Sequence, residues 1–216
     1  MALEATHMRF ALDVKDRYTI KNKAEYIQGT VYPDSRYVSK INRELTHSSN
    51  FLKPDFVIDD FHAGWQVHLL CDKIQRRTFQ ENIHGFDKFT HVGYEENQWI
   101  HFTAAKIILD MKDVQSFGLQ STLEYLDSKH RPNGEDISII QKNNQIMINL
   151  YQNKKVPSID DYIAMWNDFG ISNDLGEKVR EKVEQLNSDE VNETIWSCYG
   201  KMIQAFDETR SKFFSS

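Results

Sequence analysis

The sequence predicts an all-α fold. Apolar residues recur at helical spacing over long segments, and only four prolines and nine glycines occur among 216 residues. Alternating apolar and polar residues, which would indicate strands, are hard to find. A chain of this length can bury one large core. We therefore expect a multi-helix bundle, with a metal-binding helical core over 1–130 and C-terminal helices over 131–216 packed on the same domain.

The first half of the chain predicts two short helices, a loop and a long helix. A helix is expected over 6–18, where apolar side chains form one stripe. A second helix over 22–28 is expected to end at Gly29, because glycine commonly terminates helices. Residues 29–55 lack clear periodicity, and a loop of this length is usually either functional or disordered. A long helix over 58–80 follows.

The second half predicts further helices on both sides of one turn. The segment His130-Arg131-Pro132-Asn133-Gly134 contains strong turn residues and marks the clearest boundary in the chain. Before it, apolar periodicity predicts helices over 97–113 and 119–129. After it, the same pattern predicts helices over 135–152, 159–168, 174–186 and 189–213.

Charge and cysteine content exclude several classes of protein. The formal net charge of −6 disfavours general binding to nucleic-acid backbones. Cys71 and Cys198 lie far apart, which fits neither a disulfide framework nor a zinc knuckle. No run of about eighteen apolar residues predicts a membrane span, and no apolar leader is recognised, so we expect a cytoplasmic protein. The oligomeric state stays open.

The most informative pattern is a histidine and an aspartate four residues apart, His68 and Asp72. Helical spacing places them on one face, about 5–6 Å apart at Cβ, so both can reach one cation. His7, Asp34 and His47 lie upstream and add donors of the types that zinc prefers. The same donors also suit iron, manganese or nickel. The surroundings of His68 and Asp72 are apolar, where polar groups are costly unless they are paired or coordinated.

Each of these residues also has a purely structural explanation. His68 and Asp72 can be a hydrogen-bonded pair inside a helical core. Asp34 lies in a Pro-Asp-Ser sequence that forms turns by itself. His47 can neighbour a helix cap, and His7 begins a His-Met dipeptide that expression vectors often leave behind. These explanations account for each residue singly, but not for their order along the chain.

That order resembles a known family. Four motifs follow one another as Thr6-His7, Ile27-Gln28-Gly29-Thr30-Val31-Tyr32-Pro33-Asp34, Thr46-His47 and Gly64-x-x-x-His68-x-x-x-Asp72. Together they resemble zinc-dependent phospholipase C, which shares its helical fold with S1/P1-type nucleases. The resemblance covers residues 6–80.

The resemblance implies a zinc-dependent phosphoesterase. It implies that Asp34, His47, His68 and Asp72 hold one zinc ion, and that Asp72 bridges to a second zinc shared with His7. It also implies that Asp34 acts as general base on the attacking water.

This chain departs from the family in two respects. Secreted members begin with a tryptophan whose amino group binds zinc, whereas here other residues precede the first histidine. A further zinc of the family uses two histidines and a glutamate. His91 and Glu95 have the required H-x-x-x-E spacing and His84 lies upstream, but Gly85 and Gly93 interrupt a helix there. A mononuclear or dinuclear centre is therefore favoured.

The leading hypothesis is a metal-dependent hydrolase acting on a small soluble phosphoester, a phosphodiesterase or phosphohydrolase. Arg36, Lys40 or Arg43 would orient the phosphate, and the sequence does not choose among them. Phospholipid is disfavoured as substrate, since nothing resembles a membrane-docking surface.

Two other functions compete with this hypothesis. A phosphohydrolase of the HD type is also all-α, but its adjacent His-Asp pair is absent from this sequence. The alternative from another class is a non-catalytic helical interaction or regulatory module, whose metal site is structural or has been lost.

Overall fold

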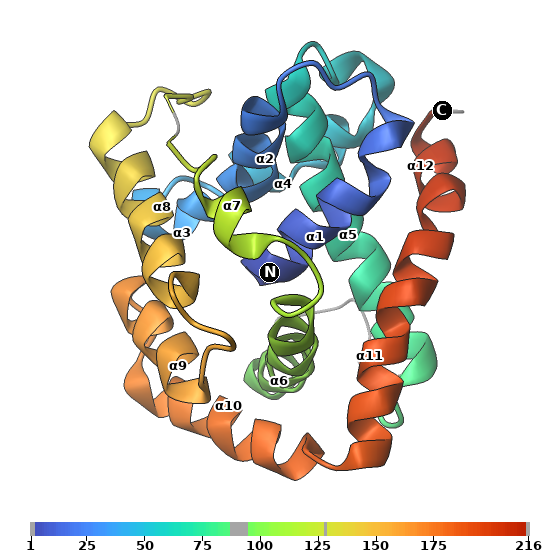
Figure 1. Ribbon diagram of the computed structural model, residues 1–216, viewed down its shortest axis with the longest axis vertical. Coiled ribbons are helices and arrows are strands. Elements are labelled where there is room, and N and C mark those ends of the chain that lie inside the picture. Colours follow the sequence, from blue (N-terminus) through green and yellow to red (C-terminus); the bar gives the residue numbers. More distant parts are fainter. Residues whose placement is uncertain (1–2, 87–94, 128, 215–216) are drawn as a thin grey trace.

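The protein is an all-α bundle, as the sequence predicts. The structure is a computed structural model that describes residues 3–86, 95–127 and 129–214, and these ranges contain helices and turns but no strand (Figure 1). None of the helices in these ranges is both long and apolar enough to cross a bilayer.

The first part of the chain combines one long helix with several short ones. In chain order these are α1 (Glu4–Val14), η1 (Lys15–Arg17), α2 (Lys23–Val31), η2 (Tyr32–Ser35), α3 (Arg36–Ser39), α4 (Glu44–His47), η3 (Ser49–Leu52), η4 (Pro54–Phe56) and α5 (Asp60–Asn82). The remaining helices are α6 (Glu96–Asp113), α7 (Leu119–Leu123), α8 (Ile137–Tyr151), α9 (Ile159–Asp168), α10 (Asn173–Leu186), α11 (Asp189–Gln204) and α12 (Phe206–Phe214).

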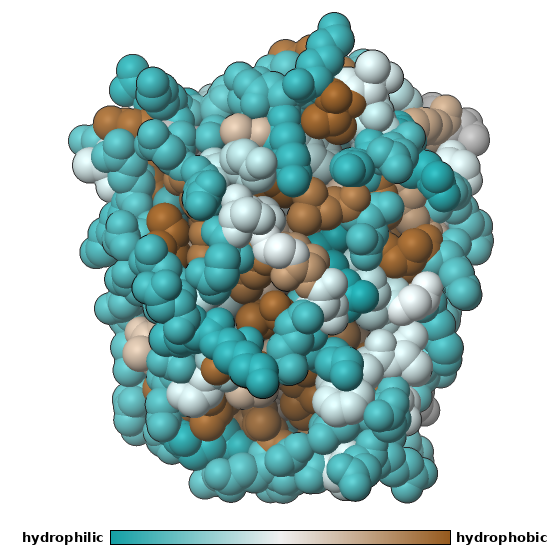
Figure 2. All heavy atoms as spheres, in the orientation of Figure 1, coloured by the Kyte–Doolittle hydropathy of each residue, from teal (hydrophilic) through white to brown (hydrophobic). Residues whose placement is uncertain are grey.

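Helix α6 lies at the centre of the bundle. Figure 1 shows it almost end-on, framed by α8 and α9 on one side and by α10 and α11 on the others, and α1, α10 and α11 all contact it. Aromatic side chains such as Tyr26, Tyr151 and Trp166 are completely buried in the core. Hydrophilic residues cover most of the face seen in Figure 2, with apolar side chains visible between them.

The structure corrects the sequence prediction at four points. The helix predicted over 119–129 is shorter, because α7 ends at Leu123. Gly29 does not end a helix, because α2 continues to Val31. Residues 29–55 are not an irregular loop, since short α and 3-10 helices occupy most of them. The last predicted helix is divided at Ala205, where α11 ends before α12 begins. Short helices of three or four residues show too little periodicity to be recognised in a sequence.

Helices α2 and α5 cross in close contact at two glycines. A Cβ atom built on Gly29 would lie 1.9 Å from the carbonyl oxygen of Phe61, and one built on Gly64 would lie 1.9 Å from that of Tyr26. Any other side chain at either position would force the helices apart, so both glycines are required for this close approach.

We predict that Gly64→Ala destabilises the protein by about 3 kcal/mol, because the added methyl group overlaps backbone atoms that cannot move aside. Urea denaturation followed by circular dichroism measures the change. Gly200→Ala is the matched control: its Cβ meets nothing within 4 Å, so this variant is expected to be neutral or up to about 1 kcal/mol more stable. Equal stability of Gly64→Ala and wild type would contradict the close crossing.

Candidate metal centre

The structure brings all five predicted donors together. His7 lies on α1, Asp34 in η2, His47 at the end of α4, and His68 and Asp72 on α5. Their ligand atoms form two overlapping groups, one of His7, His68 and Asp72 and one of Asp34, His47 and His68, each with all its atoms within 4.8 Å of one another. Four separate elements thus converge on one point.

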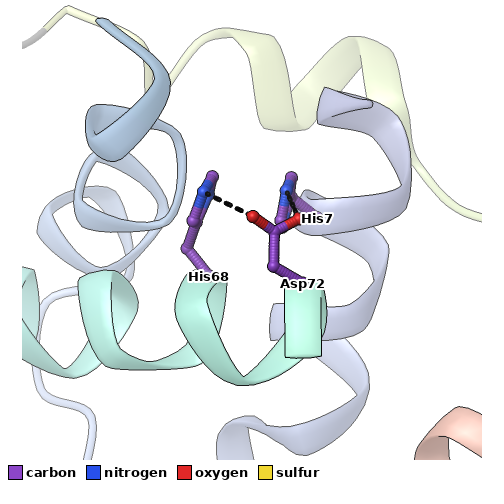
Figure 3. Close-up of side chains that lie close together, drawn as sticks. All are labelled: His7, His68 and Asp72. Carbon is purple, nitrogen blue, oxygen red and sulfur yellow. Dashed lines mark ion pairs between the residues drawn. The ribbon is translucent and has the colours of Figure 1, made fainter. Parts of the chain in front are cut away.

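The first group joins α1 to α5. Figure 3 shows His68 and Asp72 on successive turns of one helix, with His7 reaching them from the other. The two imidazole rings are stacked, with centroids 3.8 Å apart and planes 11° from parallel. Asp72 Oδ1 lies 3.7 Å from His7 Nε2, and Asp72 Oδ2 lies 3.9 Å from His68 Nε2. Each carboxylate oxygen therefore faces a different imidazole.

The second group adds donors from the chain that follows α2. His47 Nε2 lies 3.6 Å from Asp34 Oδ1 and 3.9 Å from Asp72 Oδ2. Asp72 Oδ2 thus faces two histidines, His47 and His68, whereas its other oxygen faces His7. A carboxylate with its two oxygens directed at different donor sets has the orientation needed to bridge two ions.

The donor atoms fit a divalent cation. Six buried atoms in the cluster have no hydrogen-bond partner in the described structure: both ring nitrogens of His7, both carboxylate oxygens of Asp34, and Nε2 of His47 and His68. Separations of 3.6–3.9 Å exceed a hydrogen bond. They do match two atoms that each bind one ion at about 2.1 Å, since such atoms lie roughly 3.4–4.2 Å apart.

Hydrogen bonds behind the donors orient two of the rings. His68 Nδ1–H donates to the carbonyl oxygen of Thr30 at 2.8 Å, which leaves the Nε2 lone pair directed at the cluster. His47 Nδ1 lies 2.8 Å from the hydroxyl of Thr46, which itself donates to the carbonyl oxygen of Arg43. The Nδ1 proton of His47 can therefore be donated to that hydroxyl. Such partners fix the tautomer of histidines that bind metals.

Burial keeps the imidazoles neutral. Desolvation lowers the pKa of His7 and His68 below the usual range, and it lowers that of His47 to about 2. The neighbouring His68 adds to the lowering at His7 and His47. Metal binding requires neutral imidazole, so these rings need not lose a proton before binding an ion near neutral pH.

Glu4 was not among the predicted donors, although it lies one helical turn before His7 on α1. Its side chain is buried and Oε2 has no hydrogen-bond partner among the described residues. Burial raises its pKa well above the usual range, and the carboxylates of Asp34, Asp110 and Asp72 raise it further. The i, i+3 spacing of Glu4 and His7 was the available signal. The burial of both residues also shows that this segment is part of the fold.

The cluster has one open side. His47 and Asp72 line a cavity of about 600 Å³, and the Asp72 side chain is 15% exposed, whereas His7, Asp34, His47 and His68 are each 2% exposed or less. Among the three cations considered for phosphate binding, Arg43 alone lines this cavity. Arg36 contacts the Tyr37 hydroxyl, and Lys40 donates to the carbonyl oxygen of Phe169.

The residues considered for a further zinc ion, His84, His91 and Glu95, lie only partly within the described residues. His91 lies outside the described residues, and His84 is exposed after the end of α5. Glu95 precedes α6 and lines the same cavity as Asp72.

Comparison with protein-family models, with curated proteins and with solved structures gave no match.

We predict that the purified protein, with any tag removed, holds at least one equivalent of a divalent transition metal. The double variant His68→Ala/Asp72→Ala is expected to lose it, because both ligand groups then lack a member. Elemental analysis measures the content. His62→Ala, on α5 but paired with Asp59 outside the cluster, is the control and is expected to retain metal. A wild-type protein that takes up no zinc, iron, manganese or nickel would contradict the site.

We predict that the metal-free protein loses stability as the pH falls from 7 to 5. His47 has a folded-state pKa of about 2, whereas an unfolded histidine titrates near 6.5. Below about pH 6.5 the unfolded chain binds the additional proton, so this contribution to stability is present above that pH and is lost below it. His47→Gln should therefore lose about 2 kcal/mol less than wild type over this interval. Urea denaturation in the presence of chelator at both pH values measures the difference, and equal losses would contradict a buried neutral imidazole.

Proposed function

We propose that this chain is a metal-dependent phosphoester hydrolase that resembles zinc-dependent phospholipase C. The observation that carries the proposal is the convergence of five His and Asp side chains at a point that opens into a cavity lined by cations; four of them, His7, Asp34, His47 and His68, have buried donor atoms without a hydrogen-bond partner in the described structure. Their order along the sequence is that of the family motifs. Zinc is the proposed ion, and iron, manganese and nickel suit the same donors.

Such an ion supplies a Lewis acid for a phosphoryl oxygen and lowers the pKa of its water toward about 7. The chain's own side chains would first hold the ions in place. Asp34, His47 and His68 would hold one ion, and Asp72 would link it to a second beside His7. Both oxygens of Asp34 lack a hydrogen-bond partner in the described structure, so one oxygen can bind an ion while the other accepts a proton from water.

Arg43 is the proposed phosphate-orienting cation. It directly precedes α4, whose last residue is His47, and it lines the cavity that reaches Asp72. Its guanidinium can donate two parallel hydrogen bonds to a phosphoryl oxygen pair. A small soluble phosphodiester or phosphomonoester is the proposed substrate.

The alternative is a non-catalytic interaction or regulatory module with a structural metal. Its support is the near-complete burial of four donors, because structural sites are closed whereas catalytic sites keep a position for water. The exposed edge of Asp72 favours catalysis, so turnover has to be measured together with metal content.

We predict that wild-type protein loaded with zinc hydrolyses bis(p-nitrophenyl) phosphate, and that Asp34→Asn retains at least one metal ion but loses activity by about 10²-fold or more, as expected for removal of a general base. Release of p-nitrophenol and elemental analysis give the two readouts. Asp55→Asn is the matched control, since Asp55 is an exposed aspartate in η4. Metal-loaded wild type without turnover of any phosphoester would favour the structural alternative.

A further inference from the structure

The cavity beside the metal centre is strongly basic. Six cationic side chains line it, whereas Asp72 and Glu95 are its two acidic residues among those described. The cations are Arg43, Lys73, Arg76, Arg77, Lys106 and Lys212. The chain as a whole carries a formal net charge of −6, so this concentration of positive charge opposes the average of the protein.

Two of these cations are compensated by surface carboxylates. Arg77 donates to Glu81 at 2.7 Å, and Lys212 donates to Glu208 at 2.8 Å. Arg43 and Lys73, in contrast, form no ion pair with any described residue. Their charge is available to a molecule that enters the cavity.

These two cations are placed by the metal-binding segments themselves. Arg43 lies four residues before His47, and Lys73 directly follows Asp72 on α5. His47 and Asp72 are the cluster members that line the cavity, so Arg43 and Lys73 lie on the same two segments that bring the cluster to the cavity wall. Lys106, almost buried in α6, brings a further positive charge to the same wall. One phosphate beside a metal ion does not require this many cations.

We propose that the cavity binds a second anionic group of the substrate, so that the protein prefers phosphoesters that carry a further phosphate or carboxylate. This inference rests on the proposed function, because it assigns the scissile phosphate to the metal centre. Arg43 orients the scissile phosphate, and Lys73 holds the second anion. Trp99, Phe102 and Phe213 also line the cavity and cover the carbon part of the molecule. The volume of about 600 Å³ accommodates a small molecule of this kind.

Calorimetric titration of the metal-loaded protein with fructose 1,6-bisphosphate and with fructose 6-phosphate tests the inference. We expect the bisphosphate to bind at least tenfold more tightly. Lys73→Gln should reduce the bisphosphate affinity to that of the monophosphate and leave the monophosphate affinity within about threefold. Lys142→Gln is the matched control, since it removes the same charge from an exposed position that does not line the cavity. This control should keep the tenfold preference.

Equal affinity for the two sugar phosphates, or a preference that survives Lys73→Gln, would overturn the inference. Binding is measured apart from turnover, so the two proposals fail separately. If the protein prefers the bisphosphate but hydrolyses no phosphoester, only the proposed hydrolase activity is contradicted. If it hydrolyses phosphoesters but binds the two sugar phosphates equally, only the second anion site is contradicted. Competition against the bisphosphate by vesicles that contain phosphatidylinositol 4-phosphate, but not by vesicles that contain phosphatidylinositol, would identify the second anion as that of a lipid headgroup. Absence of such competition would identify a soluble phosphoester.

Discussion

The close crossing of α2 and α5 is the constraint on which the candidate site depends. Gly29 and Gly64 let the two backbones approach until no Cβ fits between them. This approach brings the carbonyl oxygen of Thr30 within hydrogen-bonding distance of His68, so the crossing itself orients a candidate metal donor. The chain then continues from α2 into η2, which carries Asp34. A packing contact and a chemical site therefore share one stretch of backbone.

The cluster is costly for the protein unless something binds it. Each buried polar atom left without a partner costs about 1–3 kcal/mol, and the cluster contains six of them. The sum is comparable with the whole stability of a typical domain, about 5–15 kcal/mol. The lowered pKa values of the histidines exclude the simplest remedy, which is protonation by solvent near neutral pH. A divalent cation satisfies the nitrogen and carboxylate lone pairs together, which is why the unpartnered atoms support a metal centre.

The sequence predicted the long helices and the pairing of His68 with Asp72, because both depend on local spacing. The other three donors, His7, Asp34 and His47, were expected only from the order of the family motifs. Helical periodicity locates α5, and the four-residue interval places His68 and Asp72 on one face whatever the rest of the chain does. The role of Gly29 could not be predicted, since a glycine looks the same at a helix end and at a helix crossing. Nor could the sequence choose Arg43 over Arg36 and Lys40, because that choice depends on which side chains have partners elsewhere.

The cavity also changes how the second half of the chain is understood. The five donors of the cluster come from residues 7–72, and the helices after residue 130 were predicted to lie outside the metal-binding core. Yet Lys212 and Phe213 on α12 line the cavity that opens onto Asp72, together with Trp99 and Lys106 on α6. Helices far apart in sequence therefore form its walls. The donors that would hold a metal and the surface that would recognise a substrate come from different parts of the chain, so only the folded bundle brings chemistry and recognition together.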